Sequence, residues 1–359
     1  MNPGDPISEE YLPLVKFFST LKEFKGQLVK SDVYNNIRVH KKDDMYLYNY
    51  SDVVIVPRNH PMLVKCRGLV LRGDGIVLNY PFDRFFNDWE NDSKAIISWN
   101  TAVAQEKLDG SLISIFWNGK DWEVCTRGCF YPNENNLEHT LDYAEEFKRL
   151  FNNFDYLNKE CSYIFELISD KNRIVTKYDK EFVALIGARN LITLEEKDQH
   201  YLNALAMILE VYRPKQIPVQ NIEGCKKLFE NMRDDEEGLV IVDEQYHRIK
   251  LKQESYLKMS KIKALKDEDI LDYILGRIEL DQEFVHAFPE VKEKINETML
   301  KWEKYDSTLE ILYNKLSPLL VISRKDFALE VIKYPKYRAC LFARADGKVY
   351  KDYVRVDML

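Results

Sequence analysis

The pattern of the sequence changes near residue 258, and this change limits the folds that the chain can adopt. Before it, short strand-like runs alternate with turn signals, as where Gly73-Asp74-Gly75 separates 67–71 from 76–78. After it, about 100 residues have helical spacing, with Pro289 and Pro318 as punctuation. Strands and helices do not alternate regularly, which disfavours a doubly wound parallel sheet. We therefore predict an α+β fold, with antiparallel sheets in residues 1–258 and a small all-α domain in 259–359.

Periodicity places the individual elements within these two parts. Alternating and apolar runs predict strands at 101–106, 112–117, 122–126, 163–168, 181–188, 238–242 and 248–252. Apolar residues three and four apart predict helices at 11–29, 136–150, 202–212, 268–276, 281–287, 290–316 and 325–333. The chain should therefore hold two separate cores, which its 359 residues are enough to build.

Composition narrows the functional classes. Hydrophobic residues make up 45% and charged residues 31%, as in ordinary globular proteins, and no apolar run is long enough to span a membrane. The net charge of −7 argues against a protein that merely coats nucleic acid, but it allows a local basic groove. Six scattered cysteines without a C-x-x-C pair indicate reduced thiols and no zinc site. With no secretory signal at the N-terminus, we expect a cytoplasmic monomer.

The most informative short motif is Lys107-Leu108-Asp109-Gly110-Ser111, which lies between two predicted strands. If Gly110 forms a turn there, Lys107 can point into a cleft, and a lysine whose pKa is lowered can act as a nucleophile. A Lys-x-Asp-Gly string often occurs by chance, so the motif taken alone favours an exposed hairpin turn.

Charged residues farther along the chain favour a catalytic interpretation. Glu166 interrupts an apolar strand, where a carboxylate needs a partner or a cleft. Glu237 directly precedes the strand predicted over 238–242, and period-2 alternation puts Lys250 and Lys252 on one face of the last strand. Two adjacent ammonium groups imply an anion between them, and a triphosphate would fit. The alternatives are a glutamate on a sheet edge and a solvated strand face.

Four elements follow one another along the chain: Lys-x-Asp-Gly, the strand glutamate, Glu-Gly and Lys-x-Lys. This order resembles that of the covalent nucleotidyltransferases, which include DNA ligases, RNA ligases and capping enzymes. Finer elements resemble the bacteriophage RNA ligase 1 type. They are Arg67-Gly68, Asp83-Arg84-Phe85-Phe86-Asn87, Asn172-Arg173-Ile174-Val175, Gly187-Ala188-Arg189 and Tyr256. One departure is Arg84, where that family usually has lysine, so a planar fork replaces a point contact. The resemblance covers roughly residues 65–260 and implies an antiparallel, ATP-grasp-like nucleotidyltransferase domain.

The resemblance also implies a three-step reaction and a set of roles. Lys107 would attack the α-phosphorus of ATP and carry AMP, AMP would pass to an RNA 5′-phosphate, and a 3′-hydroxyl would then displace it. Lys250 and Lys252 would hold the α-phosphate and, with the metal ion, favour a neutral Lys107. The remaining nucleotide-binding residues would be Arg67 and Arg84 at the pyrophosphate, Asp109 in the motif, Glu166 at the ribose, Phe182 at the adenine, and Glu237 at Mg²⁺ or Mn²⁺, directly or through water.

The part after residue 258 would select the RNA, with broken tRNA as one possible substrate. Between residues 324 and 355, nine Lys and Arg residues outnumber four acids, and tyrosines lie among them. Such a mixture suits single-stranded RNA, although a solvated helix and tail would give the same pattern. The alternatives are a DNA ligase or capping enzyme, which would need an OB-fold barrel after Lys252, and a non-catalytic RNA-binding module.

Overall fold

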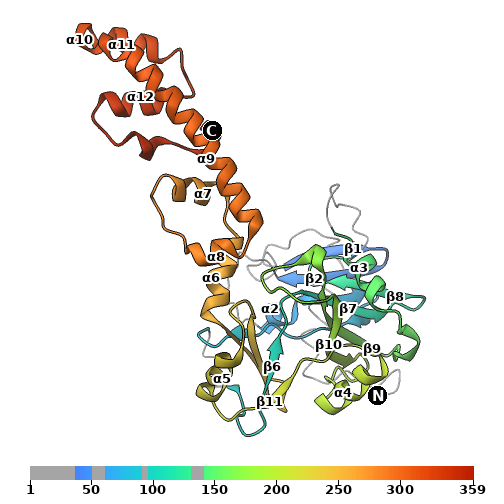
Figure 1. Ribbon diagram of the computed structural model, residues 1–359. Helices are drawn as coiled ribbons and strands as arrows, with labels where there is room; N and C mark the ends of the chain where they lie inside the picture. Colours follow the sequence, from blue (N-terminus) through green and yellow to red (C-terminus); the bar gives the residue numbers. More distant parts are fainter. Residues whose placement is uncertain (1–36, 51–60, 91–95, 131–140) are drawn as a thin grey trace. The chain divides into compact units, whose positions relative to one another are not determined.

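The structure is a computed structural model that describes residues 37–50, 61–90, 96–130 and 141–359 (Figure 1). It forms two compact units, Met1–Tyr256 and Leu257–Leu359. The helix expected over 11–29 and the start of the one expected over 136–150 lie outside the described residues. The mixture of antiparallel sheets and helices confirms the predicted α+β class.

The first sheet of the larger unit is an antiparallel meander that precedes the nucleophile motif. Its order is β1-β2-β3-β4, with the strands Ile37–Lys42, Met45–Tyr50, Arg67–Arg72 and Val77–Asn79. The short helix α2 (Pro61–Lys65) lies between β2 and β3 in the sequence. Asn79 donates from Nδ2 to the carbonyl oxygen of Gly68 at 2.9 Å, which fixes the start of β3 against the end of β4.

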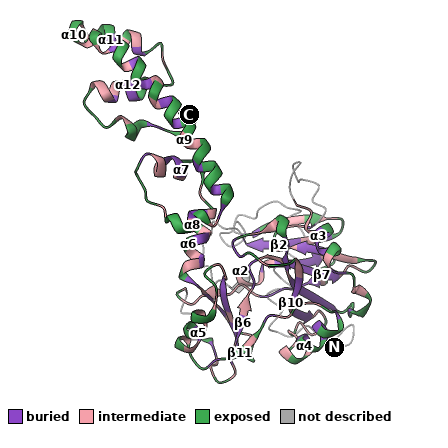
Figure 2. Cartoon of the chain, in the orientation of Figure 1, coloured by how far each residue is buried: buried purple, intermediate pink, exposed green. Residues whose placement is uncertain are grey.

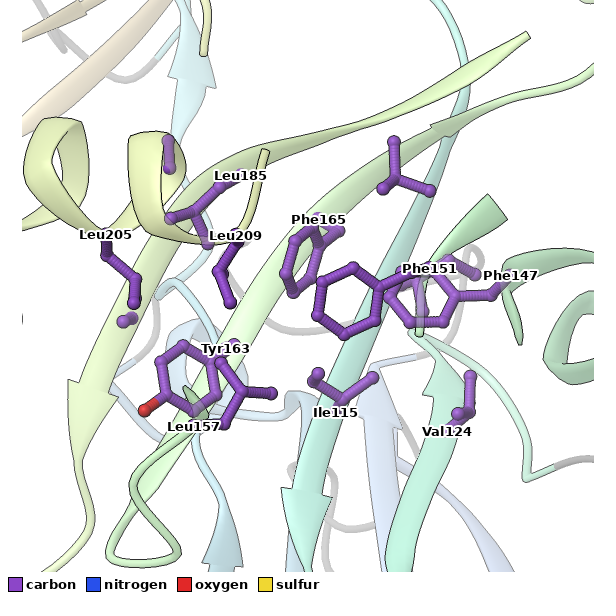
Figure 3. Packing of buried hydrophobic residues seen from close by; sticks show 14 of the residues in the cluster. Ile115, Val124, Phe147, Phe151, Leu157, Tyr163, Phe165, Leu185, Leu205 and Leu209 are labelled. Atoms are coloured by element: carbon purple, nitrogen blue, oxygen red, sulfur yellow. The ribbon is translucent and has the colours of Figure 1, made fainter. Parts of the chain in front are cut away.

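The second sheet carries the largest core of this unit. Its order is β10-β9-β7-β8, with the strands Phe182–Asn190, Cys161–Ile168, Ser111–Trp117 and Trp122–Thr126. Helices α3 (Tyr143–Leu150) and α4 (Gln199–Ile208) contribute Phe147 and Leu205 to the core of this sheet (Figure 3). Phe147 meets Phe165 edge to face with ring centroids 5.2 Å apart. Packing of this kind makes β9 a rigid support for the side chains on its other face.

The third sheet has the order β11-β6-β12-β13-β5 and presents two unlike faces. Its strands are Gln216–Pro218, Val103–Lys107, Gly238–Val242, Arg248–Lys252 and Phe86–Asn87, and α5 (Ile222–Leu228) contributes to its core. Along β13, Ile249 and Leu251 are buried in that core. Because side chains alternate, Arg248, Lys250 and Lys252 share the opposite face.

The nucleophile motif connects two sheets. The alternative interpretation of this motif as an exposed hairpin turn was therefore wrong. Strand β6 pairs with β11 and β12, whereas β7 pairs with β8 and β9. The chain therefore leaves one sheet at Lys107 and enters the other at Ser111. A Cβ at Gly110 would lie 2.3 Å from the carbonyl oxygen of Leu167, so only glycine allows this close approach between the motif and β9.

The second unit is helical in its described residues and has a core of its own. Its helices are α7 (Asp267–Ile274), α8 (Gln282–His286), α9 (Pro289–Leu316), α10 (Pro318–Ile322), α11 (Arg324–Val331) and α12 (Arg338–Ala345), and α6 (Glu254–Lys263) precedes them. Trp302, Leu309 and Phe327 are buried in this core, while much of α9 to α12 is exposed (Figure 2). In the part of the chain that the structure describes, no helix has the length and apolar character needed to cross a membrane.

Candidate active site

Three adjacent strands of the third sheet bring two lysines together. Gly238 lies opposite Lys107 on β6 and opposite Lys252 on β13, so these residues form one row across β6, β12 and β13. Residues directly opposite one another project to the same face of a sheet. Gly238 has φ of +141°, and a Cβ on it would lie 2.1 Å from the carbonyl oxygen of Leu251. The glycine thus lets the three strands approach closely at the point where the lysines converge.

Glu237 joins the two lysines through its two carboxylate oxygens. Its Oε1 lies 2.6 Å from Lys252 Nζ, and its Oε2 forms an ion pair with Lys107 Nζ. Burial opposes the charge of the Glu237 carboxylate, but Lys107 and Lys252 outweigh this effect and lower its pKa. In the free protein, Glu237 therefore holds the ammonium of Lys107 in place.

The same carboxylates determine the protonation of Lys107. Burial favours the neutral amine, yet attraction from Glu237 and Glu166 is stronger and raises the pKa of Lys107. In the free protein, the two carboxylates thus favour the ammonium form, and the expectation that Lys250, Lys252 and a metal ion favour a neutral Lys107 stays a prediction for the loaded site. Attack on phosphorus requires the neutral amine, so the environment of Lys107 must change when its substrate binds.

Glu166 reaches the same cavity from the second sheet. It pairs with Leu112 and Ala184 in the middle of β9, and its Oε1 accepts a hydrogen bond of 3.2 Å from the backbone N–H of Gly110. Burial raises the pKa of the Glu166 carboxyl to about 7. At neutral pH this carboxyl can thus donate a hydrogen bond as the acid or accept hydrogen bonds as the carboxylate.

Two further cations line the cavity close to Phe85. The ring centroid of Phe85 lies 5.6 Å from Arg67 Cζ and 5.3 Å from Lys250 Nζ. Burial, with help from the positive charges of Arg67 and Lys107, lowers the pKa of Lys250 to about 8. Arg67 Nη1 is buried and has no hydrogen-bond partner among the described residues. Partly buried cations at the wall of a cavity fit the binding of a phosphate chain.

These groups line one cavity of about 170 Å³. Of the residues assigned from the sequence, it contains Arg67, Lys107, Glu166, Lys250 and Lys252. Glu237 lies behind this lining and pairs with two residues of it, Lys107 and Lys252. The sequence interpretation missed the apolar lining, which comprises Phe82, Phe85, Leu108, Leu112, Ile186, Pro214 and Val240. Of these, Phe85 had a signal, because it lies in the quoted element 83–87.

Asp109 is occupied by protein partners. Its Oδ2 accepts hydrogen bonds of 2.8 Å from the backbone N–H groups of Val175 and Thr176, and its Oδ1 accepts one of 2.6 Å from the Tyr256 hydroxyl. A carboxylate with both oxygens engaged in this way positions the nucleophile motif against the rest of the unit. Direct contact between Asp109 and a nucleotide stays a prediction, and the geometry favours the positioning role.

Arg84 and Phe182 lie outside the lining of this cavity. Arg84 Cζ lies 4.1 Å from the ring centroid of Tyr50, and Arg84 lines a second, neighbouring cavity. Phe182 is the first residue of β10 and packs against Tyr178 and Tyr212, with centroids 5.6 and 5.0 Å away. Their assigned roles at pyrophosphate and adenine therefore stay predictions.

The donor set suits a divalent metal that is held mainly by phosphate. Among the described residues, no group of three His, Cys, Asp or Glu side chains is arranged as a metal site. Mg²⁺ in phosphate-transfer sites keeps several waters and uses only one or two carboxylates, so Glu237 alone is compatible with it. Because both of its oxygens are paired with lysines, the metal would need the nucleotide to bring the remaining oxygen ligands.

Gly238→Ala should damage both the fold and the site. The left-handed φ and the contact with Leu251 should cost about 1–3 kcal/mol, which corresponds to a fall of roughly 5 °C in Tm. Gly119→Ala is the matched control, since Gly119 also has positive φ (+104°) but has open space around its Cβ position. Thermal melting of both variants should show the larger loss for Gly238→Ala. Equal melting temperatures would contradict the crowding described for this row.

Comparisons with known proteins agree with this geometry. A protein-family model described as RNA ligase matches residues 65–264. The chain is 29% identical over 284 residues to a protein of Autographa californica nuclear polyhedrosis virus named "Putative bifunctional polynucleotide kinase/RNA ligase", covering 72% of this chain and 40% of that protein. It is 23% identical over 385 residues to an RNA ligase of Rhodothermus phage RM378, covering 87% of each. The chain thus spans less than half of the first relative and most of the second.

Among solved structures, one match is "Archaeal ATP-dependent RNA ligase - form 2", with a TM-score of 0.48 and 13% identity, covering 85% of this chain and 83% of that chain.

Proposed function

This chain belongs to the RNA ligase family of the bacteriophage RNA ligase 1 type, a family of ATP-dependent RNA ligases, and we propose that it seals RNA through an AMP carried on Lys107. The observation that carries the proposal is the convergence of Lys107, Lys252, Glu237 and Glu166, from two sheets, on one cavity that Arg67 and Lys250 also line. The substrates would be ATP and RNA ends bearing a 5′-phosphate and a 3′-hydroxyl, and broken tRNA is one candidate.

The site can support each step of that reaction with its own residues. Lys252 and Lys250 would stabilise the charge on the α-phosphate, and Arg67 the charge on the outgoing pyrophosphate. Glu166 would accept hydrogen bonds from the ribose hydroxyls. Mg²⁺ or Mn²⁺, held by Glu237 and the phosphates, would supply further charge neutralisation. The phosphates would compete with Glu237 for Lys107, and the metal ion would compete with Lys107 for Glu237, so both would weaken the ion pair that holds the lysine.

The first experiment is intact-protein mass spectrometry after incubation with ATP and Mg²⁺. We expect the mass to increase by one AMP, and peptide mapping should locate the AMP on Lys107. Labelled RNA and DNA ends then separate an RNA ligase from a DNA ligase. A chain that binds RNA but never takes up AMP would support the non-catalytic alternative. The cytoplasm, of a host cell if the gene is viral, is the compartment that we propose for this reaction.

We also propose that Leu257–Leu359 selects the RNA. In this unit, Arg324 pairs with Asp346, and Arg344 with Glu310, so part of the basic stretch has a structural role. Tyr334, Tyr337 and Tyr350 pack against the core, whereas Tyr353 is 39% exposed. The surface left for RNA is therefore smaller than the sequence suggests. It comprises exposed basic residues such as Lys325, Lys348 and Lys351.

A truncation tests this division of roles. A chain ending at Ala264 keeps α6 whole and retains every residue proposed for AMP transfer, so we expect it to take up AMP at close to the wild-type rate. Sealing of structured RNA should fall roughly tenfold more than sealing of short oligonucleotides, because phosphate contacts outside the cavity are lost. Circular dichroism and thermal melting establish whether the truncated chain folds. A folded truncation that discriminates among RNAs as the full chain does would place selectivity in the first unit.

A further inference from the structure

A second cavity adjoins the candidate active site and shares Phe85 and Arg248 with it. We call it the second chamber. It measures about 470 Å³ and is lined by Lys65, Arg84, Phe86, Tyr246, His247 and Arg248, among others. This volume is within the range of small-molecule sites. The cavity lies wholly within the larger unit.

The lining of the second chamber has the chemistry of a nucleotide site. It combines the aromatic rings of Phe86 and Tyr246 with the cations Lys65 and Arg84. Rings stack on bases and cations contact the backbone in proteins that bind single-stranded nucleic acid. Two further arginines of the lining, Arg189 and Arg248, contribute less charge, because Glu196 pairs with them at 2.9 and 2.5 Å. Asp83 and Glu195 also line the chamber, so its positive charge comes mainly from Lys65 and Arg84.

A row of cations leads from the nucleophile to this chamber. Lys252, Lys250 and Arg248 lie on one face of β13 at every second residue, so the row extends for about 13 Å. Lys252 lies in the same cross-strand row as Lys107, with Gly238 between them, and Arg248 lines both cavities. A phosphate chain that starts at Lys107 can therefore follow this row.

The order of the proposed steps determines which nucleotide this row serves. In step one, pyrophosphate leaves the α-phosphorus on the side opposite Lys107, since the displacement is in line. In step two, an oxygen of the RNA 5′-phosphate attacks the same phosphorus, the P–N bond to Lys107 breaks, and the lysine regains a proton. Lys107 is now the leaving group, so the RNA enters from the side that pyrophosphate vacated. The nucleotide attached to that phosphate then extends away from Lys107.

Tyr246 is held in the chamber in an unfavourable backbone conformation. It has φ of +65° at the tip of the β12–β13 hairpin, a region that a bulky residue rarely occupies. Buried Asp243 fixes this tip, because its side chain accepts hydrogen bonds from the backbone N–H groups of Ser98 and His247 at 2.9 Å each. Glycine or asparagine would suit the turn better. A residue kept against local preference at the wall of a cavity is a candidate for contact with a ligand.

We propose that the second chamber binds the 5′-terminal nucleotide of the phosphorylated RNA strand, with its base stacked on Tyr246. This inference rests on the proposed RNA ligase function and adds the position of the donor strand. Removing the ring should weaken the use of this strand by about tenfold, as for other bases that stack on aromatic side chains.

The experiment compares Tyr246→Gly with Tyr246→Phe and measures transfer of AMP from the adenylylated full-length chain to a 5′-phosphorylated RNA oligonucleotide. Tyr246→Gly should lose about tenfold in apparent affinity for the oligonucleotide while melting at the same or a higher temperature, and Tyr246→Phe should resemble the wild type. Glu210→Gly is the matched control. Glu210 is exposed, also has positive φ (+54°) and lies outside both cavities, so relief of its strain should leave AMP transfer unchanged.

An oligonucleotide whose first nucleotide lacks a base identifies the contact. The wild type should lose about tenfold on this substrate, and Tyr246→Gly should lose almost nothing further, because the stacking partner is already absent. Equal losses in both proteins would overturn the proposal. The proposal would also be overturned if Tyr246→Gly removed the effect of a missing base at the 3′-hydroxyl end, because the chamber would then bind the other strand.

Binding of the labelled oligonucleotide, measured by fluorescence anisotropy, separates the proposed ligase function from the proposed nucleotide site. Binding that depends on Tyr246 without any uptake of AMP would reject only the ligase function.

Discussion

Lys107→Ala is expected to form no AMP adduct and to seal RNA at less than about a thousandth of the wild-type rate. Lys107 is the lysine whose Nζ lies against Glu237 in the cavity, and an alanine provides no nucleophile for the α-phosphorus. The measurement is transfer of radioactive AMP from ATP to the protein, followed by ligation of a labelled oligonucleotide.

Two further variants make this result specific. Lys107→Arg keeps the positive charge but should fail equally, since a guanidinium stays protonated and cannot attack phosphorus. Lys120→Ala is the control for loss of a lysine, because Lys120 is exposed in the turn between β7 and β8; it should retain full activity. Normal adduct formation by Lys107→Ala would show that another residue is the nucleophile.

Much of the larger unit could be predicted because its strands have clear local patterns. The runs at 122–126, 238–242 and 248–252 form strands with the expected bounds, since apolar alternation and flanking turns fix both ends. The pairing of strands was harder to predict. Strands β6 and β7 are separated by only three residues, which suggests a hairpin, yet each pairs with strands far along the chain. Local periodicity carries no information about such long-range pairing.

The candidate site shows the same division between local and long-range information. Alternation along β13 predicted correctly that Lys250 and Lys252 share a face. The ion pairs of Glu237 with Lys107 and Lys252 depend on the register of three strands, and no local pattern reveals that register. The protonation state of Lys107 and the hydrogen bonds of Asp109 also depend on tertiary contacts, so the sequence alone could not predict them. The strained Tyr246 likewise has a sequence signal only as a bulky residue in a turn.

Glu237 pairs with both Lys107 and Lys252, yet we expect Lys252 to matter in more steps of the reaction than Lys107. Lys107 is needed as a nucleophile only while AMP is being loaded. Lys252 instead contacts the other oxygen of Glu237, Oε1, from β13. We propose that its charge stabilises the negative charge that develops on phosphorus in every step.

RNA that already carries AMP on its 5′-phosphate separates these two roles. Lys107→Ala should still seal this substrate measurably, because the last step requires the site and not the nucleophile. Lys252→Met keeps the apolar stem of the side chain but removes its charge, and it should lower both AMP uptake and sealing of adenylylated RNA by about 10²–10³-fold.

The assay is single-turnover sealing with both variants at saturating protein, with thermal melting to confirm that each is folded. Loss of Lys252 leaves Glu237 paired only with Lys107, so a modest fall in Tm is expected and must be compared with the assay temperature. If Lys252→Met seals adenylylated RNA at the wild-type rate, Lys252 does not stabilise phosphate charge in the last step. Its position beside Lys107 would then serve only to position Glu237 during AMP uptake.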